Sequence, residues 1–193
     1  MSGLLNEFHG QKQAALGNYD ALAQDSENRR ISMLRLIAGG YHRLGQSEKA
    51  TEIVERYQEA NGPSPTIAAF ADSRSFAREL EPAAGMAEAL FAGAEMLLRT
   101  RPNDYRAQLA IAYAQMALHL DSDMIIARRF VGITLAARGH LEESNAILSA
   151  VGDDEPGHLE AQMQIAENLT RMEREEDALA ALRSTARSHG EWP

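Results

Sequence analysis

The sequence predicts an all-α fold, a solenoid built from antiparallel helix pairs. Apolar residues recur at helical spacing on both sides of short loops, as they do around Gly139. The same frame then recurs along the chain: a loop residue, a small residue five positions later, and a larger apolar or aromatic residue after that. These sets are Gly10, Ala15 and Tyr19; Gly45, Ala50 and Val54; Gly139, Ser144 and Leu148; and Glu173, Ala178 and Leu182. The step from Gly139 to Glu173, roughly 34 residues, is typical of helix-pair repeats.

The N-terminal residues predict the end of a helix over 4–9, closed by Gly10, and a partner helix over 12–24. A complete first helix would need residues ahead of Met1. The pattern therefore favours a chain that begins inside a repeat, with a partial repeat over 1–30. A short N-terminal helix is the alternative.

Residues 31–62 have the clearest pattern. Apolar side chains recur at helical spacing up to Gly45, and Ser47 is placed to cap the second helix. This second helix is expected to end at Asn61-Gly62-Pro63.

Residues 63–86 break the repeat. Pro63, Pro65 and Pro82 bracket two short apolar stretches, and neither is long enough for a standard helix pair. We expect one or two short helices and an extended connector here.

Regular spacing returns at Met86. Small side chains at Ala50 and Gly132 mark positions where we expect neighbouring helices to approach most closely. The expected units are a repeat over 87–124 with an inserted loop at 99–104, a repeat over 125–158, a repeat over 159–187 and a tail over 188–193.

The residues at these positions resemble the tetratricopeptide repeat (TPR) family, whose first helix combines large, aliphatic, small and aromatic side chains in a fixed order. From Ile31 the matching residues are Leu34, Ile37, Ala38, Tyr41, Gly45, Ala50, Val54 and Tyr57. From Ile125 they are Arg128, Val131, Gly132, Leu135, Gly139, Ser144, Leu148 and Val151. From Leu159 they are Gln162, Ile165, Ala166, Leu169, Ala178 and Leu182.

The chain departs from the family pattern in three ways. It lacks the tryptophan early in the repeat and the proline near its end, and it has the insertion in the repeat that begins near Ala87. Residues 87–91, and the stretch from Ile147 onward, also look like a segment of long uncharacterised bacterial TPR proteins. The resemblance covers most of the chain outside 63–86 and implies a right-handed superhelix of antiparallel helix pairs.

In the TPR family the first helix of each pair lines a concave groove that binds a protein or peptide segment. The resemblance places Ser32, Arg35, Gly39 and His42; Glu88, Phe91, Glu95 and Leu98; Ile126, Arg129, Ile133 and Ala136; and Glu160, Met163, Glu167 and Thr170 in that groove. From these we expect a binding surface formed by Arg35, Phe91, Glu95, Arg129, Ile133, Met163 and Glu167.

In this surface Phe91 and Met163 would be apolar anchors, and Arg129 would pair with a carboxylate or a backbone carbonyl of the partner. The asparagine by which related TPR proteins bind chaperone tails is missing at Gly39, Glu95, Ile133 and Glu167, so a carboxylate clamp is not expected. The alternative is that these residues coat an unused groove or pack against the 63–86 segment.

Composition narrows the partner class. The formal net charge of −9 argues against a nucleic-acid partner, because binding to phosphates needs a basic surface. No apolar run reaches transmembrane length, so no membrane insertion is expected. Residues 1–7 have neither a basic stretch nor a long apolar stretch, so no signal peptide is recognised, and cytoplasm and periplasm both stay open.

The sequence contains no motif for catalysis, a cofactor or a metal. There is no cysteine, no histidine pair at helical spacing, no Gly-rich phosphate loop and no Gly-x-Ser-x-Gly element. The acidic loops near Asp121 and Asp153, and the combinations of His140 with Glu143 and His158 with Glu160, are interpreted as solvated side chains. The acid pairs Glu142-Glu143 and Glu175-Glu176 stand at expected helix starts, where carboxylates favour the helix dipole.

The sequence therefore predicts a non-catalytic scaffold for protein interaction or assembly. One alternative is a structural segment of a longer solenoid, or a module that self-associates through uncapped ends near Leu4, Leu5, Leu179 and Leu182. An enzyme whose site is assembled between repeats is a third, weaker hypothesis.

Overall fold

The computed structural model describes residues 2–24, 30–76, 81–99 and 103–189, and their regular structure is helical. The elements are α1 (Ser2–Phe8), α2 (Lys12–Gln24), α3 (Ile31–Arg43), α4 (Ser47–Asn61), α5 (Pro65–Ala68), the 3-10 helices η1 (Ala69–Ala71) and η2 (Ser73–Phe76), α6 (Pro82–Arg99), α7 (Asp104–Leu120), α8 (Ile125–Ala137), α9 (Leu141–Leu148), α10 (His158–Arg171) and α11 (Glu175–His189). The chain is an all-α solenoid, as its sequence predicts. No helix in these described ranges is both long enough and apolar enough to cross a membrane.

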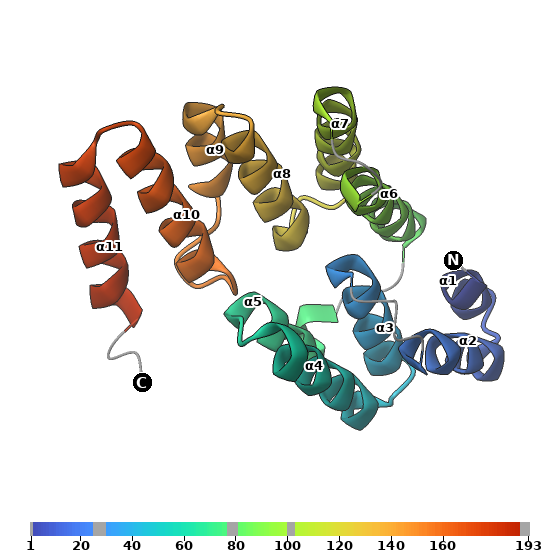
Figure 1. Cartoon of the computed structure of the whole chain (residues 1–193). Coiled ribbons are helices and arrows are strands. Elements are labelled where there is room, and N and C mark those ends of the chain that lie inside the picture. The colour runs from blue at the N-terminus through green and yellow to red at the C-terminus, as the bar shows by residue number, and fades with distance from the viewer. Residues whose placement is uncertain (1, 25–29, 77–80, 100–102, 190–193) are drawn as a thin grey trace.

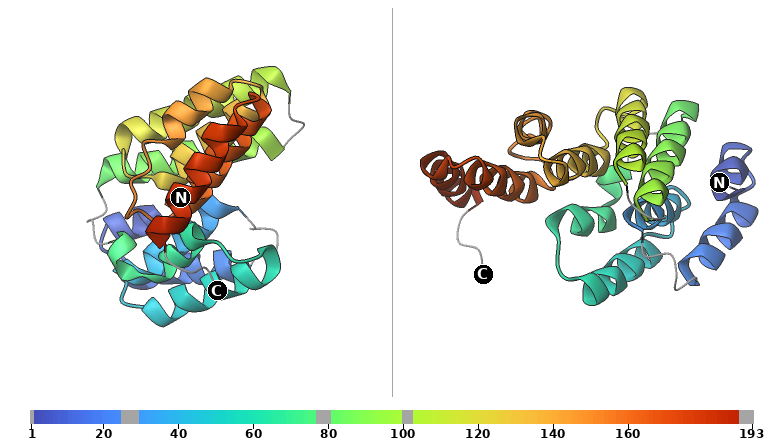
Figure 2. Two further views of the ribbon diagram at one scale, coloured as in Figure 1. Left: turned by 90° about the vertical axis from the view of Figure 1, so that its left-hand side faces the viewer. Right: turned by 45° about the horizontal axis from the view of Figure 1, so that its top comes forward.

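The helices pack in pairs that stack on one another. The pairs are α1–α2, α3–α4, α6–α7, α8–α9 and α10–α11, and α2 then packs on α3, α7 on α8, and α9 on α10. Figure 1 shows α6 to α11 following one another along one side of the molecule, with α2 to α5 on the other side. The terminal helices α1 and α11 lie at opposite ends (Figures 1 and 2).

The recurring sequence frame corresponds to a recurring turn. Gly10, Gly45, Gly139 and Glu173 have positive φ angles of 72°, 74°, 84° and 59°. In each turn the next residue donates its backbone N–H to the carbonyl five residues back, as His140 does to Leu135 at 3.0 Å and Arg174 does to Leu169 at 2.9 Å. This is the Schellman arrangement that ends a helix and reverses the chain.

The predicted close approaches are confirmed. Ala50 is fully buried, and so are Ala110, Ala114 and Ala117. At Gly132 an added Cβ would lie 2.5 Å from Cγ of Leu148, so α8 and α9 touch there without room for a side chain.

Two local predictions are corrected. Ser47 does not cap α4: it is the first helical residue, its Oγ lies 3.0 Å from Nδ1 of His42, and the cap position is occupied by Gln46 without a side-chain hydrogen bond. Helix α6 begins at Pro82 rather than near Met86, because the fixed φ of proline suits the first position of a helix. Of the expected inserted loop, residues 100–102 lie outside the described ranges.

The short helices predicted within 63–86 are present as α5, η1 and η2. They do not form another helix pair. Ile67 and Phe70 are 3% and 6% exposed and belong to the main apolar core, which extends from α2 to α8. Within the described part of this segment, Ile67 and Phe70 therefore form part of the interior, so α5 and η1 are not merely a surface linker.

Candidate binding surface on the inner face

The N-terminal part of the predicted groove is an interface between α3 and α6. Arg35 forms an ion pair with Glu88, and its Nη2 lies 3.7 Å from Oδ2 of Asp121. Burial lowers the pKa of Arg35, although the charge of Asp121 opposes that shift. Because these groove-facing side chains bind one another, they are not available as a partner surface in this conformation.

Glu95 belongs to the same interface. Its Oε2 accepts a hydrogen bond of 3.1 Å from the backbone N–H of Ser32, in the first turn of α3. The cap residue of α3, Arg30, gives no side-chain cap. Glu95 thus satisfies a free N–H from a distant helix, and its carboxylate also suits the positive end of the α3 dipole.

Phe91, one of the two apolar anchors that the sequence predicts, is buried in this structure. It is 2% exposed, and its ring packs edge-to-face on Phe130 of α8, with ring centroids 5.6 Å apart. The reason is that α6 packs against α3 and α7, which places this face of α6 in the core.

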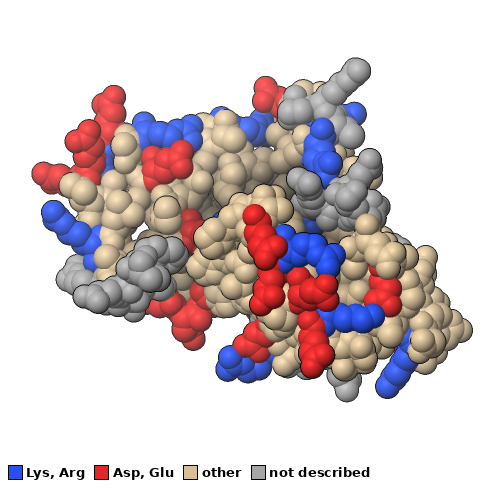
Figure 3. Space-filling view, turned by 60° about the horizontal axis from the view of Figure 1, so that its bottom comes forward, with Lys and Arg blue, Asp and Glu red and all other residues tan. Residues whose placement is uncertain are grey.

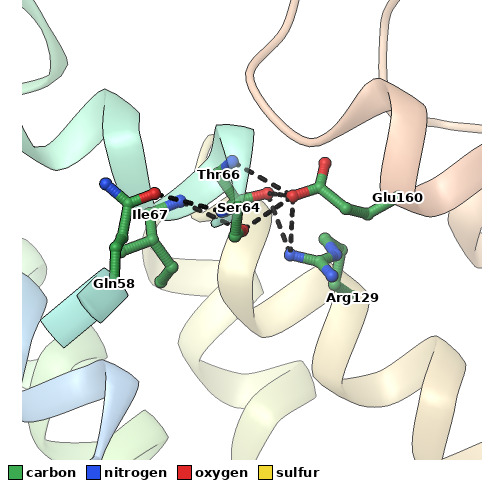
Figure 4. Close-up of polar contacts among 6 residues, drawn as sticks. All are labelled: Gln58, Ser64, Thr66, Ile67, Arg129 and Glu160. Carbon is green, nitrogen blue, oxygen red and sulfur yellow. Dashed lines mark hydrogen bonds and ion pairs between the residues drawn. The ribbon is translucent and has the colours of Figure 1, made fainter. Parts of the chain in front are cut away.

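The C-terminal part of the inner face contacts a segment of the same chain, which we call the inner segment and define as residues 64–71. Ser64 caps α5 by accepting a hydrogen bond of 3.4 Å from the backbone N–H of Ile67, and Pro65 follows at the first helical position. In Figure 4 the segment lies between Gln58 on α4 and the side chains of Arg129 and Glu160 on α8 and α10.

Glu160 is the centre of this contact. Its Oε1 accepts hydrogen bonds from Ser64 Oγ at 2.8 Å, from Thr66 Oγ1 at 3.1 Å and from the Thr66 backbone N–H at 3.2 Å (Figure 4). Arg129 Nη1 donates to Thr66 Oγ1 at 2.9 Å and lies 3.8 Å from Glu160 Oε1. The inner segment is therefore held by one acceptor and one cationic donor.

The electrostatics favour a charged pair. Burial on its own raises the pKa of Glu160, but hydrogen bonds from Ser64 and Thr66 and the charge of Arg129 outweigh burial and leave the pKa below its usual value. Burial lowers the pKa of Arg129, and Glu160 opposes that shift. The carboxylate expected to pair with Arg129 is thus supplied within the chain.

Two further contacts fix the inner segment. His42 Nε2 lies 3.0 Å from the carbonyl oxygen of Phe70. Gly157, at φ +98°, passes so close to Thr66 that a Cβ there would lie 2.5 Å from its Oγ1. A cavity of about 310 Å³ adjoins the segment, lined by Arg35, Thr66, Phe70 and Ile126 among others.

Of the seven predicted site residues, three remain open to solvent. Ile133 is 45% and Met163 is 57% exposed, and Glu167 is also exposed. Ile133 lies one helical turn beyond Arg129, and Met163 and Glu167 lie one and two turns beyond Glu160. We call Arg129, Ile133, Glu160, Met163 and Glu167 the C-terminal inner face.

Sequence reasoning missed the partners of this face and misjudged one histidine. The Ser64-Pro65 start of α5 is a recognisable cap signature, but nothing local connects it to Glu160. His158 is buried rather than solvated, with Nδ1 3.2 Å from the carbonyl oxygen of Val151 and Nε2 3.6 Å from Asp153. His140 lies 3.5 Å from Glu143, and both are exposed, as expected.

Neither the charge on the face shown in Figure 3 nor the metal-ligand geometry of the described residues points to another site. On the face shown in Figure 3, Lys and Arg side chains are interspersed with Asp and Glu and form no continuous basic surface. Within the described part of the chain, no group of three or more His, Asp or Glu side chains is arranged to hold a metal ion.

No protein-family model matches this sequence, and no curated protein sequence is significantly similar to it. Among solved structures, the chain is similar to a crystal structure of the MamA protein, with a TM-score of 0.49 and 14% identity over 97% of this chain and 87% of that chain. A second MamA structure gives a TM-score of 0.48 and 16% identity over 96% of this chain and 93% of that one.

YrrB, described as a TPR protein with an unusual peptide-binding site, gives a TM-score of 0.45 and 22% identity over 97% of this chain and 82% of that one. The stacked helix pairs of this chain and their recurring turns define it, on its own geometry, as an α-solenoid of antiparallel helix pairs.

Proposed function

We propose that this protein is a non-catalytic scaffold that binds a peptide or protein segment on its C-terminal inner face. The observation behind the proposal is the exposure of Ile133 and Met163, 45% and 57%, at positions of α8 and α10 that the repeat pattern assigns to the groove. Large apolar side chains that are exposed among polar neighbours are typical of interaction sites. Glu160 and Glu167 are the acidic neighbours on α10, and Arg129 is the basic neighbour on α8.

The proposed surface is smaller than the one expected from the sequence. Arg35, Phe91 and Glu95 are omitted, since they hold α3, α6 and α8 together. What remains is a strip along two inner helices, and its apolar side chains would provide the anchors.

A displayed library of random peptides, selected on the whole chain, tests this proposal. We expect Met163→Ala and Ile133→Ser each to weaken the selected peptides, by about thirty-fold if either residue is a hot spot of about 2 kcal/mol. Glu143→Ala, on the outer helix α9 with its side chain 61% exposed, is the matched control and should change little. Peptides that ignore both inner substitutions but respond to Glu143→Ala would rule the surface out.

Self-association is a second candidate, favoured by the terminal helices. Leu5 and Phe8 of α1 are 59% and 56% exposed, and Leu179 and Leu182 of α11 are 50% and 42% exposed. A solenoid needs polar surfaces at its ends to stay separate from other copies, and these apolar ends suit head-to-tail contact. Sedimentation should then show association that grows with concentration and is weakened in the Leu179→Lys/Leu182→Lys variant, and a monomer at every concentration would contradict it.

A further inference from the structure

We infer that the C-terminal inner face recognises a hydroxyl-capped helical turn, and that the inner segment occupies this site in the position of a ligand. The partner of the scaffold would present the same chemistry from another chain: a Ser or Thr at the cap, a second hydroxyl two residues later, and an aliphatic residue next. This inference depends on the proposed function and specifies its partner.

The contacts define what the site selects. Glu160 receives three donors, namely the cap hydroxyl, the second hydroxyl and the backbone N–H of the same residue. Backbone N–H groups in the first turn of a helix have no carbonyl acceptor within that helix, so this N–H can bond to an acceptor outside it. Every segment that starts a helix with Ser or Thr, one intervening residue and a second Thr or Ser can present this set of donors.

Arg129 adds a second requirement. Its Nη1 donates to the same Thr66 hydroxyl that donates to Glu160, so this hydroxyl must both give and accept a hydrogen bond. A valine at that position keeps the shape, but it has no hydroxyl to accept a hydrogen bond from Arg129 or to donate one to Glu160. The pair Arg129 and Glu160 therefore distinguishes a threonine from its apolar isostere.

The inner segment is attached to the site like a tethered ligand. Helix α5 has four residues, too few to be stable without tertiary contacts. Thr66 of this helix and the cap residue Ser64 bond to Glu160, 94 and 96 positions away, and α5 is not part of any stacked helix pair. Its advantages over an external segment are the burial of Ile67 and Phe70 in the core and the high effective concentration that the tether provides.

The site also has an acceptor that the inner segment leaves unused. Among the described residues no donor reaches Glu160 Oε2, although this atom is buried. A buried acceptor without a donor is costly. An external segment with one more donor at this point would satisfy it, and it could continue over Ile133 and Met163, which the inner segment leaves exposed.

A competition experiment tests the inference. The probe is a fluorescent synthetic peptide of residues 62–73, and its anisotropy is measured with the whole chain and with the S64A/T66V variant, which removes both hydroxyls from the inner segment but leaves the site intact. We expect the variant to bind the peptide at least about ten-fold more tightly than the unmodified chain, because the tethered competitor is weakened. Adding E160Q to the variant should abolish that gain.

A second peptide with the same two substitutions, and a scrambled one, are the controls, and neither should bind more tightly to the variant. Equal binding of the natural peptide to both chains, or no dependence on E160Q, would overturn the inference.

If S64A/T66V does not fold, the natural peptide is titrated into the ¹⁵N-labelled unmodified chain, where amide signals of Thr66 and Ile67 must shift. An unchanged spectrum at millimolar peptide would likewise overturn it. Library peptides that depend on Met163 but not on Glu160 would leave the proposed function standing and remove only this inference.

Discussion

The backbone at Glu173 shows what the recurring turn requires of a single residue. At φ 59° it stands in the left-handed region, in the place that Gly10, Gly45 and Gly139 occupy in the other turns. A side chain there costs about 1–2 kcal/mol, and glycine loses about 0.5–1 kcal/mol more chain entropy on folding. We therefore expect Glu173→Gly to raise the free energy of unfolding by about 0.5–1 kcal/mol in urea denaturation.

Gly139→Ala is the reverse experiment in an equivalent turn, where φ is 84° and no heavy atom lies within 4 Å of an added Cβ. It should lower the free energy of unfolding, through backbone strain alone. A stabilising Gly139→Ala would contradict the assignment of these turns.

Gly132 is constrained by packing rather than by its backbone angle. Its added Cβ would lie 2.5 Å from Cγ of Leu148, so Gly132→Ala should destabilise the fold by about 1–3 kcal/mol through overpacking. Gly17, in the middle of α2 with open space around it, is the control: Gly17→Ala should stabilise by up to about 1 kcal/mol through helix propensity. If Gly132→Ala melted at or above the temperature of the unmodified chain, as Gly17→Ala is expected to do, the α8–α9 contact would be contradicted.

At the scale of elements, the sequence predicts where the regular helices lie in the chain. It does not predict which other parts of the chain cover their polar faces. The bounds of α2 match the prediction, because a period of apolar residues and a terminal turn are local features. Periodicity identifies the apolar side of a helix, but it does not identify what covers a polar side. The sequence pattern assigns Arg35, Glu88 and Glu95 to a groove. Because α6 packs on α3, Arg35 instead pairs with Glu88, and Glu95 accepts a hydrogen bond from the Ser32 backbone.

The inner segment was beyond prediction for the same reason. Its length and its prolines indicate short helices, and these are present. Its partners, however, are Arg129 and Glu160, and no local pattern connects residues so far apart in sequence. The 63–86 segment as a partner of groove-facing residues was foreseen only as an alternative.

The contact between the inner segment and α10 should depend on pH. The folded-state pKa of Glu160 is lowered from an ordinary value of 4.5, so its contribution is complete above that value and is lost as pH falls through the folded pKa. Glu160→Gln should cost about 1.5–3 kcal/mol at neutral pH, as expected for hydrogen bonds to a charged group. Melting temperatures of the two chains should converge as the pH falls below 4.5.

Glu143→Gln, at an exposed position of α9, is the control: it shows how the melting temperature changes with pH when a carboxyl group outside this contact is removed. A constant difference between Glu160→Gln and the unmodified chain, from pH 7 down to about pH 3, would show that ionisation of Glu160 does not stabilise the contact.

For the whole molecule, the inner segment adds connections that a simple array lacks. Repeats in a solenoid contact their neighbours only, so such arrays unfold piece by piece. Here α5 bonds to α8 and α10 and packs on α4. We expect native-state hydrogen exchange to show α3 and α10 opening together in the unmodified chain.

In Ser64→Ala/Thr66→Val, α10 should exchange at least about ten-fold faster at low urea while α2 is unchanged, because sub-global units open at their own free energies. Thr51→Val is the matched control, since its hydroxyl bonds only within α4. Equal exchange of α10 in all three proteins would mean that the inner segment does not couple the two parts.

The sequence separation within this contact also sets a delay during synthesis. Thr66 leaves the ribosome 94 residues ahead of Glu160, which at about 5–20 residues per second is an interval of roughly 5–20 s. During that time the nascent chain contains α3, α4 and His42, whose ring contacts the Phe70 carbonyl. It does not yet contain Glu160, the residue that accepts hydrogen bonds from the two hydroxyls. The inner face is thus completed late in translation, and until then Ser64 and Thr66 are accessible to any protein that meets the chain at the ribosome.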